Sequence, residues 1–413
     1  MPHPYRTVAP LLLLALCSSA CLADAVDDLH ALTLADQAPV QSQQQRDWQF
    51  FTEGMYGYAF LKNGYQHIPM ARLSADLFVD TRATESLRFI FANRLDGQSY
   101  DGKFSHVNTL KEAYFSWQAS PSLVFDLGRI NQRNGMAAAY NPSDFFKAGA
   151  VRSVVSTAPA SLRENRLGSG MLRAQTFWPG GSASAIYSPQ LADHRDSAPF
   201  ALDLGASNPA NRWMLSFSHA LSATLSPQFL LYGEAHQSPQ LAFNLSALAS
   251  DALSVHLEYR GGRSKAQLDP NAPQRYYSRL ASGASYTFPA KITLTAEYQY
   301  NQAALKHAEW SALAQDPAQY WSYRSRVFSA QDIPTQHAAF FYSSWSDAIW
   351  PQLDLNWMLR ADWVDHSLQS WLEARYHLEQ AELALQWQSQ SGHRMSHFGA
   401  LPDSVQLLFK YYY

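Results

Sequence analysis

The last ten residues, Ser404 to Tyr413, constrain the fold more than any other stretch, because they alternate strictly and then stop at an aromatic residue. A strand of about ten residues at roughly 3.3 Å each, tilted by roughly 45°, just crosses the hydrocarbon core of a bilayer. Its unpaired N–H and C=O groups cannot face lipid, so the strand must pair with the first strand and close a barrel. The apolar face carries Val405, Leu407, Phe409, Tyr411 and Tyr413, and the polar face carries Gln406 and Lys410.

The rest of the chain repeats this period of two. Ile292 to Tyr300 and Leu353 to Trp363 show it most clearly, with apolar residues at every second position. The segment 240–248 shows it least. We therefore predict an all-β chain of about 18 antiparallel strands, within a range of 16 to 18. The predicted strands cover 50–60, 73–79, 87–92, 111–117, 123–129, 170–178, 182–187, 212–221, 229–236, 240–248, 253–261, 277–288, 292–300, 337–345, 353–363, 368–377, 382–388 and 404–413.

Connection lengths test this strand count independently. Bacterial barrels have short turns at the periplasmic end and long loops outside. With a periplasmic N-terminus, removing the weak strand 240–248 would put the long segment 301–335 in the periplasm, so we keep that strand. The expected periplasmic turns are 80–85, 118–122, 179–181, 222–227, 249–252, 289–291, 346–351 and 379–380. The expected extracellular loops are 94–107, 130–168, 189–210, 262–275, 301–335 and 390–403.

Alternation alone does not separate a membrane barrel from a soluble secreted β-sandwich. No run of 18 apolar residues lies outside the N-terminus, which excludes spanning helices. Trp48, Trp117, Trp178 and Trp345 lie near strand ends, where amphipathic rings settle at membrane interfaces. We therefore expect the barrel, with apolar side chains toward lipid and charges lining a lumen, and keep the sandwich as the alternative.

The N-terminus has the features of a secretory signal peptide. Arg6 precedes an apolar core from Val8 to Cys17, and Ala23-Asp24-Ala25 is an A-x-A cleavage site. We expect cleavage near Ala25, with lipid attachment at Cys21 as an alternative, since both cysteines lie in this segment. Residues 1–25 are then the signal peptide, 26–46 a periplasmic lead-in and 47–413 the barrel.

Two stretches resemble a known group of proteins. The aromatic ending resembles the assembly signal of Gram-negative outer-membrane barrels, carried here by Phe409, Tyr411 and Tyr413. Residues 127–146, with Gly128-Arg129 and Asn141-Pro-Ser-Asp144, resemble the strand-exit motif of porin-like barrels of the 18-stranded alginate-export and substrate-specific porin kind. Residues 159–173 continue the likeness. The resemblance implies that loop 130–168 folds into the lumen as a constriction.

Arginine is in excess around this loop, which has few acidic residues. A narrow lumen with low-dielectric walls would focus such a field and favour anionic or acidic solutes. The alternative is structural: the arginines pair with acids across the lumen, or with lipopolysaccharide phosphate outside. The expected pore-lining residues are Arg129, Arg133, Asp144, Arg152, Arg163, Glu164, Arg166, Arg173, Glu112, Tyr114, Asp126, Arg360 and Arg375.

Signals for other chemistry are weak. His393 and His397 have a metal-like spacing, but Gly392 and Gly399 flank them, so we predict no metal site. Ser161 to Glu164 fits a capping box that would begin a short helix. The chain lacks the Gly-x-Ser-x-Gly and His-Glu-x-x-His motifs. We predict no cofactor and no enzyme, and keep a barrel lipase or protease as a remote alternative.

The sequence therefore predicts an outer-membrane channel for passive diffusion of small solutes. Export of an acidic polysaccharide and uptake of hydrophobic compounds are the alternatives. The formal net charge of −3 argues against a nucleic acid as partner. The expected partners are outer-membrane lipid, lipopolysaccharide, the barrel assembly machinery and the transported solute or acidic polymer, and such a barrel could form a homotrimer.

Overall fold

The structure, a computed structural model, describes residues 46–62, 66–196, 198–203 and 207–413. The predicted signal peptide, Cys21 and all but the last residue of the lead-in 26–46 lie outside these residues. Within the described residues no helix is both long and apolar enough to cross a membrane.

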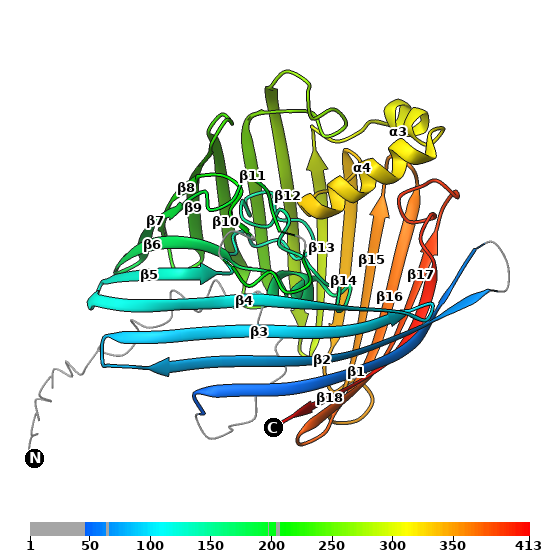
Figure 1. The fold of residues 1–413 in the computed structure, drawn as a ribbon, viewed down its shortest axis with the longest axis horizontal. Coiled ribbons are helices and arrows are strands. Elements are labelled where there is room, and N and C mark those ends of the chain that lie inside the picture. Colours follow the sequence, from blue (N-terminus) through cyan, green and yellow to red (C-terminus); the bar gives the residue numbers. More distant parts are fainter. Residues whose placement is uncertain (1–45, 63–65, 197, 204–206) are drawn as a thin grey trace, which may run out of the picture.

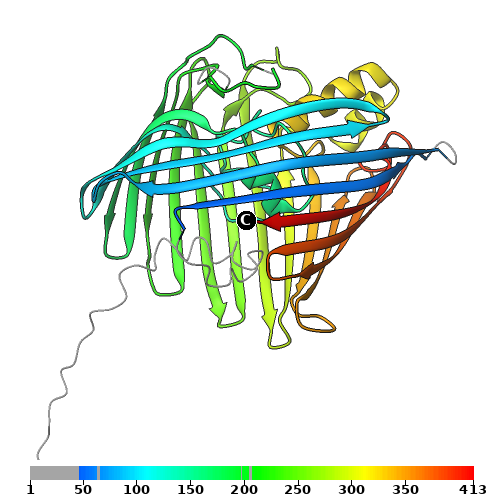
Figure 2. The ribbon, with the colours of Figure 1, turned by 60° about the horizontal axis from the view of Figure 1, so that its bottom comes forward.

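Eighteen antiparallel strands form one closed sheet (Figures 1 and 2). Each strand pairs with its neighbours in the chain, and β18 pairs with β1, so that Glu53 lies opposite Lys410. The first nine strands are β1 (Trp48–Phe60), β2 (His67–Arg82), β3 (Leu87–Tyr100), β4 (Lys103–Ser120), β5 (Leu123–Ile130), β6 (Ser169–Trp178), β7 (Gly181–Ser188), β8 (Arg212–His219) and β9 (Leu225–Glu234). The others are β10 (Gln240–Ser250), β11 (Leu253–Ser264), β12 (Arg275–Phe288), β13 (Ile292–Asn301), β14 (His337–Trp345), β15 (Leu353–Asp362), β16 (Ser367–His377), β17 (Ala381–Ser391) and β18 (Asp403–Tyr412).

The predicted all-β barrel, its strand number and the weak strand at 240–248 are confirmed. Strand β10 shows why the weak strand was hard to recognise: its buried side carries Gln240, Ala242 and Asn244. A buried face made of amides and a small residue lacks the apolar residues on which recognition of a soluble strand depends.

The barrel is apolar outside and polar inside. Leu241 on β10 is 63% exposed, whereas its neighbour Gln240 is 2% exposed and Asn244 is fully buried. Leu73 and Leu127 likewise face outward with more than 60% of their surface exposed. A soluble sandwich would bury these leucines against each other, so the distribution is that of a barrel whose outer face meets lipid.

The two ends differ in their connections, as predicted. Short turns lie at one end, and long loops with the helices lie at the other (Figure 1). One predicted loop, 94–107, is wrong: β3 and β4 continue as a hairpin that turns at Asp101 and Gly102. Both turn residues have positive φ, 52° and 71°, which a two-residue turn between twisted strands requires.

Within the described residues, three helices lie in the long loops. Helix α2 (Pro159–Glu164) is in the loop between β5 and β6, and α3 (His307–Leu313) and α4 (Pro317–Ala330) are between β13 and β14. The predicted capping box at Ser161 is wrong, because α2 already begins at Pro159, whose ring favours the first helical turn. Helices α3 and α4 were not predicted from the sequence. Asp316 caps α4 by accepting hydrogen bonds from the N–H groups of Ala318 and Gln319.

Candidate functional site: the lumen and its loop

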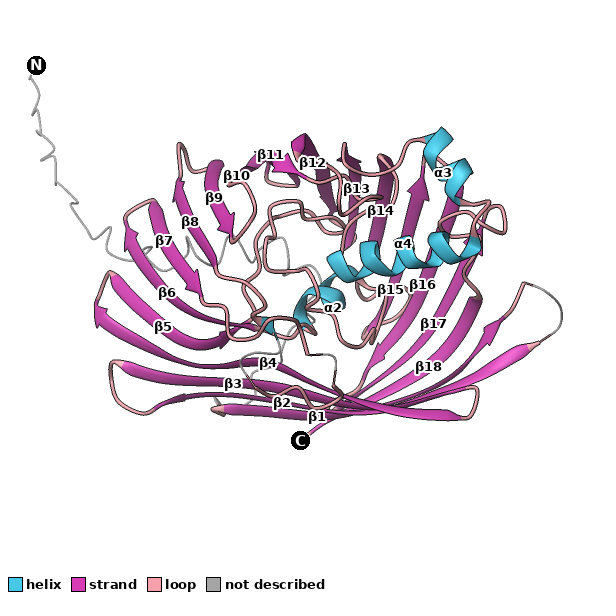
Figure 3. Cartoon of the chain, turned by 45° about the horizontal axis from the view of Figure 1, so that its top comes forward, coloured by secondary structure: helices cyan, strands magenta, loops and turns pink. Residues whose placement is uncertain are grey.

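The segment 131–168 leaves β5, folds into the ring of strands and returns at β6 (Figure 3). We call it the constriction loop. It carries α2, and its contacts reach the inner wall on several sides of the barrel, described below. The resemblance to porin-like barrels predicted that this loop folds into the lumen, and in the structure the loop lies inside the ring of strands (Figure 3).

Two carboxylates of the inner wall hold the first part of the constriction loop. Glu258 on β11 accepts hydrogen bonds from the N–H of Ala137 at 2.5 Å and from Ser143 Oγ at 2.9 Å. Glu297 on β13 accepts from the N–H of Ala138 at 2.5 Å and of Ala139 at 3.1 Å. Hydrogen bonds to a charged acceptor are stronger than neutral ones, so these groups fix the loop to the wall.

Gly135 permits this close approach. It has φ of 91°, and a Cβ atom there would lie 2.5 Å from Oε2 of Glu258. A side chain at position 135 would therefore clash with the carboxylate and strain the backbone. Gly135 is therefore needed for the loop's anchoring to Glu258.

An apolar patch on the neighbouring part of the inner wall, formed by residues of β5 to β10, holds the middle of the loop. Phe145 stacks on Tyr232 of β9, with ring centroids 4.4 Å apart, and Phe146 meets the same ring edge-on at 6.0 Å. Arg260 and Arg212 cover the two phenyl rings at 4.6 and 4.9 Å. The patch is completed by Ile130, Met171, Ile186, Met214, Leu230 and Ala242.

Lys147, directly after this pair of phenylalanines, is a buried cation. Its Nζ donates to the carbonyl of Asn141 at 2.7 Å and lies 4.7 Å from the ring of Tyr140. Burial lowers the pKa of Lys147 to about 8, and the carboxylates of Asp332 and Asp144 oppose that shift. The loop therefore holds a lysine whose charge is only partly compensated.

Several predicted arginines hold loops in place. Arg129 donates to the carbonyl of Gly168 at 2.5 Å and to Ser207 Oγ at 2.9 Å, and Arg152 donates to the carbonyl of Asp196 at 3.3 Å. These bonds tie the constriction loop and β5 to the loop between β7 and β8. Both guanidinium groups are thereby occupied by backbone and side-chain oxygens.

Other predicted residues form pairs. Arg166 and Asp144 form a buried ion pair at 2.6 Å within the loop. Arg173 on β6 pairs with Asp126 on β5 at 2.8 Å. Arg375 bridges Glu373 at 2.8 Å and Glu382 at 2.5 Å. The structure brings these residues together in the pairs that a structural role would require.

Four other predicted residues, Arg133, Arg163, Glu164 and Arg360, form no salt bridge within the described residues. Arg133 and Glu164 are exposed, and neither forms a salt bridge within the described part of the chain. Arg163 donates to the carbonyls of Asn134 and Gly135, at 3.2 and 3.1 Å. Arg360 on β15 is half-buried, and its Nε has no hydrogen-bond partner.

Glu112 and Tyr114 come from the polar side of β4. Glu112 lies within electrostatic range of Arg133 and Arg173, and Tyr114 packs against the apolar patch that holds Phe145. Glu112 therefore contributes to the electrostatic surroundings of Arg133. Tyr114 contributes to the apolar patch that holds the constriction loop.

The sequence analysis missed a charged network on the inner faces of β1 to β4. Glu53 accepts from Arg72 at 2.7 Å and from Arg94 at 3.0 Å, and Lys111 pairs with Asp76 at 2.8 Å. Arg72 also donates to the carbonyl of Val155 in the constriction loop at 2.9 Å. Polar residues at every second position of β2, with charges at Arg72 and Asp76 on either side of Ser74, were the available signal.

The histidine pair of the last long loop is engaged in local contacts. His397 Nδ1 lies 3.2 Å from a carboxylate oxygen of Asp362. Among the described residues, no group of three or more His, Cys, Asp or Glu side chains could hold a metal ion.

At the level of sequence, no protein family and no curated protein matches the chain. The fold, by contrast, is similar to solved Occ/OprD-type outer-membrane porins. OccAB1 of Acinetobacter baumannii has a TM-score of 0.57 at 11% identity, over 89% of this chain and 96% of that chain. OccK8 (OprE) of Pseudomonas aeruginosa has a TM-score of 0.54 at 10% identity, over 89% and 97%. OccK7 (OpdD) of the same organism has 0.53 at 11%, over 89% and 98%. At these identities the likeness establishes the fold.

Proposed function

We propose that this barrel is an outer-membrane channel through which small solutes diffuse passively, with a preference for anionic or acidic ones. The solute passes the constriction loop without a covalent step. The proposal assigns the barrel to the bacterial outer membrane after export and removal of residues 1–25.

The observation that carries this proposal is the distribution of polar side chains. Asp96, Glu258 and Asn244 have no exposed surface on the inner side, while leucines and aromatic rings cover the outer side. Buried charge is costly unless a wet interior and partners compensate it. A closed wall that is polar inside and apolar outside suits a water-filled passage through lipid.

We assign selectivity to luminal cations that form no salt bridge within the described residues. Arg133 is exposed on the constriction loop, and Arg360 projects from the wall with no hydrogen-bond partner for its Nε in the described part of the chain. Arg163 is held by backbone carbonyls, so its charge is not neutralised by a carboxylate bond. In a confined, low-dielectric lumen such charges attract anions.

The charges elsewhere on the inner wall favour small solutes over an acidic polymer. The network around Glu53 alternates acids and bases, with Asp76 and Asp96 facing Arg94 and Lys111. An exporter of an acidic polymer would need a continuous electropositive surface, and these interleaved carboxylates would repel such a chain.

Assembly and lipid contacts complete the proposal. We propose that the barrel assembly machinery recognises β18, with Phe409, Tyr411 and Tyr413 as its aromatic residues. Lipopolysaccharide would surround the end that carries the long loops, because bacterial barrels place those loops outside.

Planar-bilayer recording tests the proposed function. The refolded barrel is expected to insert in discrete conductance steps and to show a reversal potential displaced toward the anion in a salt gradient. Arg133→Ala and Arg360→Ala should each lower the anion-to-cation permeability ratio severalfold, because each removes a luminal positive charge that forms no salt bridge within the described residues. Lys265→Ala, which removes an exposed lysine from another loop of the same end, is the matched control.

A correctly folded barrel that produces no conductance steps would refute the channel. An unchanged permeability ratio in both arginine variants would refute the assignment of selectivity to these residues.

A further inference from the structure

The outer surface of the barrel is hollowed over β13, β14 and β15. The floor of this hollow consists of small side chains, Ala296, Ala339 and Ala361. Ala339 lies directly opposite Ala361 in the sheet, so the small residues adjoin. The resulting groove has a volume of about 430 Å³. We call it the alanine groove.

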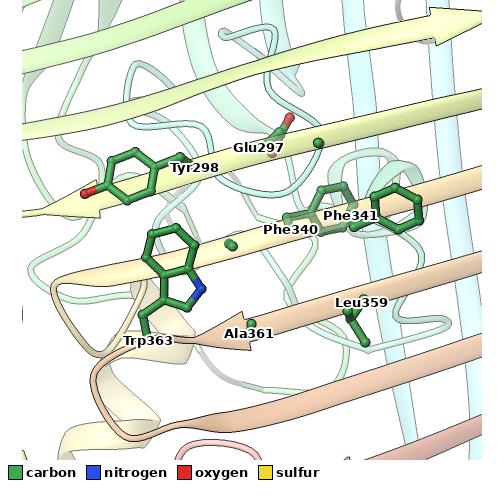
Figure 4. Close-up of a pocket in the computed structure, with 9 residues that line it drawn as sticks. Glu297, Tyr298, Phe340, Phe341, Leu359, Ala361 and Trp363 are labelled. Carbon is green, nitrogen blue, oxygen red and sulfur yellow. The ribbon is translucent and has the colours of Figure 1, made fainter.

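Aromatic rings border the alanine groove, as Figure 4 shows. Phe341 lies at one end, and Tyr298 and Trp363 lie at the other, with ring centroids 5.4 Å apart. Trp363 is 53% exposed. Amphipathic rings of this kind settle where the hydrocarbon of a bilayer meets its headgroups. The apolar groove therefore ends at the level where lipid headgroups begin.

A second cavity of about 430 Å³ adjoins the alanine groove at Trp363, which lines both. Its lining is basic: Lys306, His307, His337 and His366 surround it. Lys306 and His307 come from the start of the long loop after β13, and His366 comes from the turn between β15 and β16. His337 is the first residue of β14. The cavity therefore lies toward the end that carries the long loops. We call it the basic cavity.

Within the described residues the ammonium of Lys306 forms no salt bridge. Two carboxylates lie nearby and are hydrogen-bonded: Glu309 accepts from the backbone N–H of Lys306 at 2.9 Å, and Asp362 accepts from Thr335 at 2.6 Å. His307 Nδ1 is held by the carbonyl of Val364 at 2.8 Å. The lining of the cavity thus combines a cation with imidazole groups and includes no Asp or Glu side chain.

We propose that the alanine groove and the basic cavity together form a binding site for one phosphorylated glycolipid of the outer leaflet, a lipid A-type molecule. One acyl chain lies over the three alanines, and a phosphate lies beside Lys306 and the histidines. Buried apolar area and attraction between a basic pocket and an anionic headgroup both stabilise such a complex. The inference rests on the proposed outer-membrane location, because only the outer leaflet meets this end of the barrel.

The apolar alanine groove and the basic cavity lie next to each other on the surface, and this arrangement favours a lipid A-type molecule over other ligands. A second barrel would cover the alanine groove but offer nothing to an uncompensated lysine beyond it. Free phosphate would engage the basic cavity but leave the groove unused. Only a molecule that is apolar at one end and anionic at the other matches both halves at once.

Native mass spectrometry of the detergent-solubilised barrel tests the site, with bisphosphorylated lipid A as the probe. The wild-type barrel is expected to retain one lipid. Lys306→Ala combined with His366→Ala should weaken retention at least tenfold, because it removes the uncompensated charge and an exposed imidazole. Ala339→Leu should do the same by filling the groove. Lys265→Ala, and Ala75→Leu on the outer face of β2, are the matched controls and should bind as wild type does.

Heat-modifiable migration in gels verifies that each variant is folded. Equal retention in the wild type, the basic-cavity variant and Ala339→Leu would overturn the site. Displacement of the lipid by phosphatidylglycerol or by inorganic phosphate alone at equal concentration would overturn the choice of glycolipid. Dimer formation that is abolished by Ala339→Leu, without lipid retention, would assign the groove to a second copy instead.

Conductance of the same preparations separates this inference from the proposed function. A barrel that conducts but retains no lipid refutes the site alone. A barrel that retains lipid A but never conducts refutes the channel alone.

Discussion

Single residues decide how the constriction loop is held inside the barrel. At Lys147, burial of the ammonium opposes its attraction to nearby carboxylates. Its ammonium is buried between Tyr140 and the carbonyl of Asn141, and the pKa of Lys147 is lowered from 10.5 to about 8. The unfolded chain therefore binds this proton more tightly than the folded chain between pH 8 and pH 10.5. Across that window, stability rises with pH by on the order of 3 kcal/mol from this group.

Lys147→Met should remove this contribution. We expect the stability of the wild type relative to Lys147→Met to increase as the pH rises from 7 to 10, because the variant has no proton to release. Thermal unfolding midpoints of the two barrels, measured in parallel at both pH values, provide the comparison. A difference between the two midpoints that stays constant with pH would contradict a buried, depressed lysine.

At the scale of elements, the constriction loop depends on wall positions that are remote in sequence. Glu258 on β11 and Glu297 on β13 receive the N–H groups of residues 136–139, more than 100 residues away. Gly135 provides the space for this contact. The inner wall, more than the loop's own sequence, thus determines where this part of the loop lies.

Glu258→Gln should loosen this anchor. The neutral side chain keeps its size but weakens bonds worth about 1.5–3 kcal/mol each when the acceptor is charged. We expect amide hydrogen exchange at residues 136–139 to accelerate at least tenfold, and open-channel current noise to increase. Glu164→Gln, in the same loop but exposed, serves as the control and should exchange as the wild type does. Unchanged exchange in Glu258→Gln would show that other contacts suffice to hold the loop.

At the scale of the whole molecule, closure of the barrel depends on the C-terminal strand. Strand β18 pairs with both β17 and β1, and the ring of Tyr413 packs on Phe50 at 5.1 Å. The N–H of Tyr413 also donates to the carbonyl of Phe50 at 3.1 Å. The last residue therefore joins the two ends of the sheet.

Tyr413→Ala should slow assembly in cells severalfold, because it removes an aromatic pair that contributes about 0.5–1.5 kcal/mol beyond buried area. Tyr413→Phe keeps the ring and should assemble as the wild type does. Pulse-labelling followed by gel migration without heating measures the folded fraction over time. Equal rates for the alanine and phenylalanine variants would exclude a role for the ring.

The sequence by itself determined the closed barrel, its 18 strands and the difference between its two ends. These depend on a period of two and on turn residues, which are local signals repeated along the chain. Only the tertiary structure decided which arginines are free and which are paired. Arg173 meets Asp126 and Arg129 meets the loop before β8 because the sheet closes, and that closure brings distant residues together. The same holds for the alanine groove and the basic cavity. Their residues adjoin only through the register of β13 to β15 and because the loop after β13 meets the turn between β15 and β16.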